Sequence, residues 1–164
     1  METKISSAKM EIIISDKNPV AMIGERINPT GKKKLSEALR AGDFDVVRQE
    51  AIAQVESGAH ILDVNVAASG INEIAVLPKA VEAVMGVVDV PLCIDINNPA
   101  ALKETLRIYE GKAIVNSVSG EEKSLNEVLP LVKEHGTAVI GLTIDDKGIP
   151  KTIGKRLEIA HKIV

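Results

Sequence analysis

Short apolar runs that end in acids and amides recur along this chain. The clearest covers residues 90–99, VPLCIDINNP, where an apolar segment ends in Asp95 and two asparagines before Pro99. A continuous apolar run of this length predicts a strand buried on both faces, as in a parallel sheet. Similar runs lie at residues 20–28, 59–65, 113–117 and 138–143. The pattern predicts buried parallel strands that each deliver polar groups at their carboxyl end, where α/β proteins place ligand sites.

Between these runs, apolar residues recur at helical spacing. Such stripes lie within residues 32–39, 44–58, 74–88, 99–108, 121–135 and 153–164. Strands that alternate with helices through short connections predict right-handed crossovers and a parallel sheet. Pro130 predicts a kink or a break in its helix. The lysines 32–34 are expected to be a solvated helix start, with a grip on the carboxylate tail of a ligand as the alternative.

The pattern divides the chain into two parts. Residues 1–19 are expected to be an N-terminal segment that can form a hairpin, because 10–14 predicts a strand and 15–19 a turn. Residues 20–164 are expected to be the N-terminal part of a barrel domain. A barrel is favoured over an open doubly wound sheet because polar groups follow every strand, whereas no GxGxxG or Walker glycine loop follows any of them.

The length of the chain bears on this barrel. A (β/α)8 TIM-type barrel needs about 250 residues, whereas this sequence has 164 and ends inside a helical segment. We therefore expect an incomplete parallel (β/α)8 fold with about five β/α units, as the first part of a longer barrel. A self-contained five-stranded sheet is the alternative.

Composition excludes several classes of function. Aromatic residues make up 1% of the chain and the net charge is −3, which argues against nucleic acid and anionic membranes as partners. The sequence lacks an apolar run of membrane-spanning length and a signal core, so a cytoplasmic protein is expected. Cys93, inside an apolar run, is expected to be a small buried hydrophobe. No His, Cys and carboxylate spacing predicts a metal site.

Four motifs, in order and each at a predicted strand end, resemble a known family. They are IGERINPTG at 23–31, GAHILDVN at 58–65, Ile94-Asp95 and IVNS at 114–117. Together they resemble the pterin-binding barrel of methyltetrahydrofolate:corrinoid methyltransferases and the folate domain of cobalamin-dependent methionine synthase. The resemblance implies a homodimeric barrel enzyme with 5-methyltetrahydrofolate or tetrahydrofolate as substrate. It would exchange a methyl group with the cobalt of cobalamin, carried by a partner corrinoid protein.

The resemblance also implies roles for particular residues. Asp95 and Asn116 would bind the aminopyrimidine edge of the pterin, since a carboxylate accepts two parallel N–H bonds and an amide both donates and accepts. Asp63 would lie in a polar network beside the reacting nitrogen, as the catalytic group. Three further residues would line the same mouth and contact the substrate: Glu25, Asn28 and Asn65. Any one Asp or Asn at a strand end has a simpler interpretation as a helix N-cap or turn former.

Two other functions compete with methyl transfer. Dihydropteroate synthase shares the pterin barrel, but it typically carries Asp-x-Gly-Gly-Glu-Ser-Thr where this chain has DVNVA at 63–67. A pterin-binding or purely structural module without activity is the third interpretation. This third interpretation arises because two of the family's site residues come from strands later than the five predicted here. They are the third pterin-binding Asp and the Asn that hydrogen-bonds the reacting nitrogen. Ile96 is a further departure, since the family often has Ser there.

Overall fold

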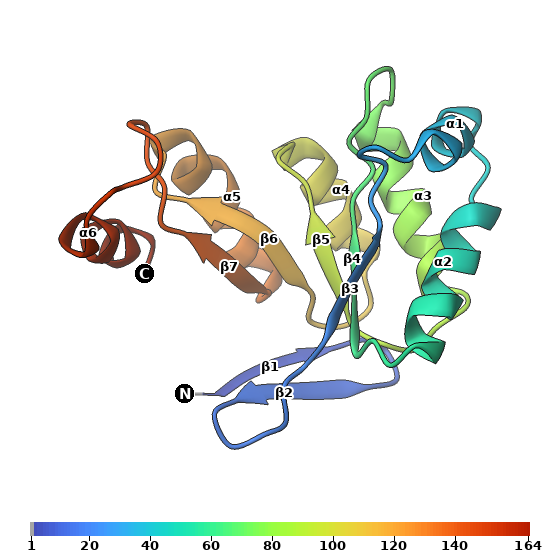
Figure 1. Ribbon diagram of the computed structural model, residues 1–164, viewed down its shortest axis with the longest axis horizontal. Coiled ribbons are helices and arrows are strands. Elements are labelled where there is room, and N and C mark those ends of the chain that lie inside the picture. Colours follow the sequence, from blue (N-terminus) through green and yellow to red (C-terminus); the bar gives the residue numbers. More distant parts are fainter. Residues whose placement is uncertain (1) are drawn as a thin grey trace.

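A five-stranded parallel sheet dominates the computed structural model, which describes residues 2–164 (Figure 1). Its strands are β3 (Ile23–Ile27), β4 (Ile61–Val64), β5 (Leu92–Asp95), β6 (Ile114–Ser119) and β7 (Ala138–Leu142). The helices are α1 (Lys33–Ala41), α2 (Asp45–Glu56), α3 (Glu73–Met85), α4 (Pro99–Ile108), α5 (Glu122–His135) and α6 (Ile153–Ile163). The predicted parallel α/β architecture is confirmed. Each strand lies beside the next in sequence, which is the order of a barrel and not of a doubly wound sheet.

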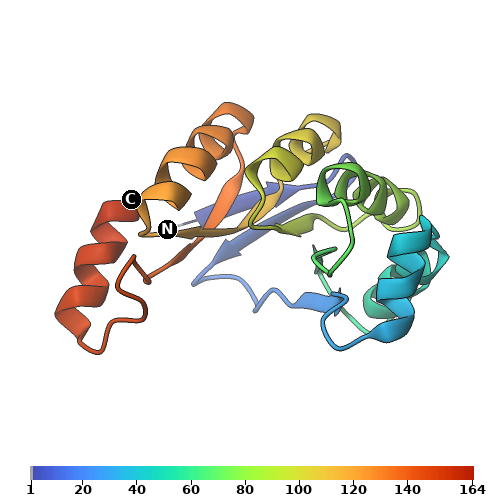
Figure 2. The same cartoon turned by 90° about the horizontal axis from the view of Figure 1, so that it is seen from above.

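The helices lie in an arc on one face of the curved sheet (Figure 2). The main core fills the space between sheet and helices, and it includes Leu62, Ile94 and Val115 from the strands and Leu102 from α4. Successive residues of a strand point to opposite faces. The neighbours of these core residues therefore project from the concave face, which the helices leave uncovered.

An antiparallel hairpin of β1 (Glu2–Ser6) and β2 (Glu11–Ser15) lies at the amino ends of the parallel strands (Figure 1). Its fully buried Ile5 packs with Ile61, Cys93 and Ile114 in a second apolar cluster on the concave face. Ser6 also exchanges two backbone hydrogen bonds of 2.9 Å with Lys112. The hairpin thus covers the lower end of the concave face and leaves the carboxyl ends of the strands open.

Tyr109 joins the hairpin to the sheet. Its hydroxyl donates to the carbonyl of Ser6 at 2.9 Å and accepts from the N–H of Leu92 at 3.0 Å. Burial raises the pKa of Tyr109 to about 12, so the hydroxyl keeps its proton. Tyr109→Phe leaves the buried N–H of Leu92 unpaired, whereas the carbonyl of Ser6 keeps its bond from the N–H of Lys112. We expect the variant to lower the free energy of unfolding by about 2 kcal/mol. Urea denaturation measures this, and an unchanged midpoint would contradict the role.

Three segments differ from the sequence prediction. Residues 2–6 form the strand β1, which the apolar pattern did not predict, so the hairpin turns at 7–10 and not at 15–19. Within the run at 20–28, only residues 23–27 form the first parallel strand. The charged Glu25 and Arg26 belong to it because β3 lies at an edge of the sheet, where their side chains can stay exposed. The sequence predicted a kink or a break at Pro130; the break is wrong, and the kink stays a prediction. Helix α5 continues through Pro130, which deletes only one backbone hydrogen bond while neighbouring apolar residues such as Val128 pack on the core.

Candidate functional site

Strand register brings the predicted polar residues together. Asp63 on β4 lies in register with Cys93 on β5, and Asp95 on β5 lies in register with Asn116 on β6. Residues in register on neighbouring strands project from the same face of a sheet, and residues two apart on one strand do so too. Because Cys93 belongs to the apolar cluster on the concave face, all four side chains point to that face. Asp95 and Asn116 lie one step nearer the carboxyl ends.

Two side-chain hydrogen bonds cross between these strands. The amide of Asn65 donates to Oδ2 of Asp95 at 2.8 Å, and the amide of Asn116 donates to Oδ2 of Asp63 at 3.1 Å. Each bond pairs an amide from one strand or its end with a carboxylate from another. Each pair leaves the second carboxylate oxygen, Oδ1, outside the bond. The arrangement therefore presents hydrogen-bond acceptors in fixed positions at one rim of the sheet.

Asp63 has the most unusual environment in this group. Its exposed fraction is 3%, and its Oδ1 atom is buried without a hydrogen-bond partner within residues 2–164. Burial raises the pKa of Asp63 to about 6; the bond from Asn116 and the neighbouring Cys93 thiol oppose this rise, and the nearby charges of Asp95 and Glu25 add to it. An unpaired buried oxygen is costly to the fold, and a strongly shifted pKa is typical of functional carboxyl groups. Asp63 can therefore exchange a proton near neutral pH.

The other predicted residues are placed differently. Glu25 lies within β3, is exposed, and is near enough for its charge to raise the pKa of Asp63. Asn65 orients Asp95. The side-chain oxygen of Asn28 accepts the N–H of Thr30 at 3.0 Å in a turn, and none of the hydrogen bonds among residues 2–164 joins Asn28 to the other predicted site residues. The ligand contacts of Glu25, Asn28 and Asn65 stay predictions.

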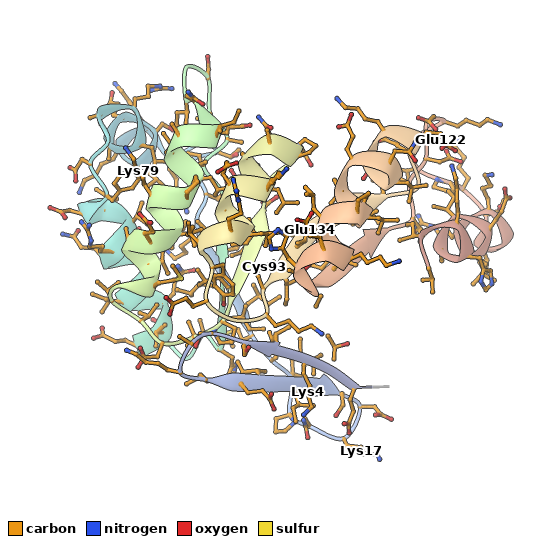
Figure 3. All side chains as sticks on the ribbon, turned by 180° about the vertical axis from the view of Figure 1, so that it is seen from behind. Lys4, Lys17, Lys79, Cys93, Glu122 and Glu134 are labelled. Atoms are coloured by element: carbon orange, nitrogen blue, oxygen red, sulfur yellow. The ribbon has the colours of Figure 1, made fainter. Side chains whose placement is uncertain are left out.

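Cys93 lies next to the candidate site, a position that was not predicted from the sequence. It is fully buried, as expected, but it lies beside Asp63 and below Asp95 on β5, near the middle of the molecule (Figure 3). Burial raises the pKa of the Cys93 thiol well above its usual range, so the thiol stays neutral. The signal was present in the sequence, because Cys93 and Asp95 are two residues apart on one strand and must share a face.

Metal-ligand groupings and membrane-spanning helices are both absent from the described part of the chain. Within residues 2–164, no three His, Cys, Asp or Glu side chains are grouped so that they could hold a metal ion. In the same range, none of the helices combines the length and the apolar character needed to cross a bilayer.

Comparison with known proteins decides the family. Residues 24–163 match the profile of the family described as pterin binding enzyme. The chain belongs to the pterin binding enzyme family. The match begins in β3 and extends to the last turn of α6, so it includes every polar residue of the cross-strand network.

The relatives of this pterin binding chain include methyl-transfer enzymes. It is 33% and 32% identical over 168 residues to the methionine synthases of Mycobacterium leprae (strain TN) and Mycobacterium tuberculosis (strain ATCC 25618 / H37Rv). It is 34% identical over 148 residues to the methylcorrinoid:tetrahydrofolate methyltransferase of Eubacterium limosum. These matches cover 99%, 99% and 87% of this chain, but 14%, 14% and 53% of the relatives. The predicted family resemblance is confirmed, and the chain spans about half or less of each relative.

Solved structures confirm the fold class. Dihydropteroate synthase from Thermus thermophilus matches with a TM-score of 0.53 and 24% identity, over 84% of this chain and 47% of that protein. The same enzyme in complex with 6HMPPP matches with a TM-score of 0.53 and 23% identity, over 84% and 48%. The described residues thus form part of a pterin-binding TIM-type barrel. At this identity, the likeness concerns the fold alone.

Proposed function

We propose that this chain binds the pterin of 5-methyltetrahydrofolate or tetrahydrofolate at the carboxyl ends of its strands. The bound folate would exchange a methyl group with the cobalt of a corrinoid carried by a partner protein. One observation carries this proposal, namely the two amide–carboxylate pairs that surround the buried, unpartnered Oδ1 of Asp63. The names of the methionine synthases and of the methylcorrinoid:tetrahydrofolate methyltransferase support it.

Asp95 and Asn116 suit the aminopyrimidine edge of a pterin. That edge presents neighbouring N–H donors, and a carboxylate can accept two of them in parallel. Both side chains are half-buried at the rim, where a flat ring can reach them. Asn65 holds one oxygen of Asp95 and so sets the plane of the carboxylate. Because the two residues are in register on adjacent strands, they can contact the same edge of one ring.

Asp63 suits the chemistry at the reacting nitrogen. When a methyl group leaves methyltetrahydrofolate, the carbon–nitrogen bond breaks, a carbon–cobalt bond forms, and the electron pair of the broken bond stays on the nitrogen. An amine is a poor leaving group until it is protonated or strongly hydrogen-bonded. A carboxyl group with a pKa of about 6 and a free buried oxygen can hold that proton beside the ring. In the reverse direction, it would accept the proton.

Ligand discrimination tests this function against the two alternatives. We expect calorimetry to show binding of methyltetrahydrofolate at least about tenfold tighter than a pterin pyrophosphate, a difference of about 1.4 kcal/mol. The reverse preference would favour a dihydropteroate synthase. Binding of neither ligand would favour a module without activity and would overturn the proposal. A chain that binds methyltetrahydrofolate can then be tested for methylation of reduced cobalamin in solution.

A further inference from the structure

A buried thiol that the proposed reaction does not use lies against the carboxyl group that it does use. Cys93 on β5 and Asp63 on β4 are in register on adjacent parallel strands, so both side chains project from the concave face. Both strands are interior strands of the sheet. The exposed fraction is 0% for Cys93 and 3% for Asp63. The two side chains therefore meet inside the fold, where little water competes for their hydrogen bonds.

The contact places a donor beside a carboxyl group whose second oxygen has no full partner. Oδ2 of Asp63 accepts from the amide of Asn116 at 3.1 Å, whereas Oδ1 is buried without a hydrogen-bond partner of ordinary geometry within residues 2–164. The thiol of Cys93 acts on this carboxyl group as a donor, and a weak one, because sulfur holds its hydrogen with little polarity. The other buried members of its cluster are apolar and offer the thiol no acceptor: Ile5, Ile61 and Ile114.

Groups on three strands act on the Asp63 carboxyl group in opposite directions. Burial favours its protonated form, and the charges of Asp95 and Glu25 add to this effect. The amide of Asn116 and the thiol of Cys93 favour the ionised form. In the proposed function Asn116 also contacts the pterin, so a bound ligand competes for its amide. Cys93 is fully buried and cannot touch a ligand, so its thiol faces Asp63 with or without one.

We propose that Cys93 is a positioning residue for the methyl transfer, because its thiol donates to the carboxyl group of Asp63 and holds that group ready to exchange a proton with the reacting nitrogen. This inference rests on the proposed function and adds a residue that touches neither the folate nor the corrinoid. Burial raises the pKa of the Cys93 thiol well above its usual range, and the charge of Asp63 adds to this. The thiol therefore keeps its hydrogen, and remains a donor, at every pH at which Asp63 titrates.

An NMR titration of the side-chain carboxyl carbon of Asp63 tests the contact in the 164-residue chain without any ligand. Cys93→Ala removes the donor, so the pKa of Asp63 should rise by at least about half a unit, or about threefold in proton affinity. Cys93→Val also lacks a donor but is larger than cysteine, and it should give the same rise if the cause is the donor and not a cavity. Cys93→Ser restores a donor and should return the pKa to the wild-type value or below it.

The matched control is Ile114→Val, which removes one carbon and no donor from the same cluster, at a residue in register with Cys93. The pKa of Asp63 should stay at its wild-type value in this variant. A comparable rise in Ile114→Val would overturn the inference, because packing alone would then explain the shift. An unchanged pKa in both Cys93→Ala and Cys93→Val would also overturn it. Either result would leave the proposed function standing.

The pH profile of methyl transfer to reduced cobalamin is the second measurement. The protonated carboxyl group is the proposed donor, so kcat/KM should fall as the pH rises through the pKa of Asp63. In Cys93→Ala this fall should move to higher pH by the same half unit or more, and in Cys93→Ser it should move back. A profile that stays in place while the titration moves would overturn the role of Cys93 in the reaction. A wild-type chain that does not bind methyltetrahydrofolate would overturn the proposed function, and this role with it.

Discussion

Asp63→Asn is expected to stabilise the folded chain at neutral pH and to slow the proposed methyl transfer by about 100-fold or more. In the folded state the pKa of Asp63 is about 6, raised from 3.8 mainly by burial. Each pKa unit corresponds to about 1.4 kcal/mol, so ionised Asp63 costs the fold about 3 kcal/mol above pH 6. Asparagine removes this cost but leaves a buried N–H unpaired, at about 1 kcal/mol. The net gain is about 2 kcal/mol.

The sign of the pH dependence makes this prediction specific. Because the folded pKa lies above the unfolded pKa, the stability that the carboxyl group contributes is greatest below pH 4 and is lost as the pH rises through about 6. The gain in the free energy of unfolding of Asp63→Asn over the wild type should therefore grow between about pH 4 and 6 and level off above that. Urea denaturation from pH 4 to 8 measures it. Asp16→Asn, in an exposed turn, is the control and should show no such profile. Equal stability of wild type and Asp63→Asn at pH 8 would contradict the burial argument.

The activity of Asp63→Asn should fall at every pH. In the proposed reaction the departing nitrogen needs a proton that asparagine cannot carry. Asparagine keeps the shape of the side chain and can still accept the bond from Asn116. A positioned proton donor contributes about 10²- to 10⁴-fold to a rate, and we expect a loss in that range with little change in folate affinity. Single-turnover methyl transfer to reduced cobalamin, with ligand affinity measured separately, checks it. Retention of the wild-type rate would remove Asp63 from the chemistry.

Asp95→Ala is expected to weaken the binding of methyltetrahydrofolate about 100-fold. The variant removes the two charge-assisted hydrogen bonds that we propose Asp95 accepts from the aminopyrimidine edge, which together contribute about 3 kcal/mol. It also leaves the amide of Asn65 without its 2.8 Å partner. Calorimetry measures the affinity, and urea denaturation shows whether the variant remains folded.

Two further variants separate the role of the charge from that of the shape. Asp95→Asn keeps an acceptor for Asn65 but offers only one acceptor oxygen in place of a carboxylate, so we expect about a tenfold loss of affinity. Asp16→Ala, which removes a carboxylate from an exposed turn, should bind as the wild type does. Unchanged affinity in both Asp95 variants would refute the assignment of the aminopyrimidine edge to this residue.

Local sequence pattern was sufficient for most of the architecture. The predicted strand within residues 90–99 is β5, at Leu92–Asp95. Asn98 caps α4 by accepting from the N–H groups of Ala100 and Ala101, with Pro99 as the first helical residue. These features depend on neighbours within one turn of chain. The errors arose where distant packing competes with a local rule, as at β3 on the sheet edge and at Pro130 within α5.

By itself the sequence determined the family, the parallel α/β order and the presence of acids and amides at the strand ends, because all of these are properties of short segments. Only the tertiary structure decided which of those groups meet. Asn65 and Asp95 are 30 residues apart, and Asn116 and Asp63 are 53 apart, so their bonds depend on strand register. The same register places Cys93 beside Asp63, whereas Asn28 turns back to Thr30. The pKa of Asp63 also depends on tertiary structure, because burial and neighbouring charges exist only once the strands are assembled.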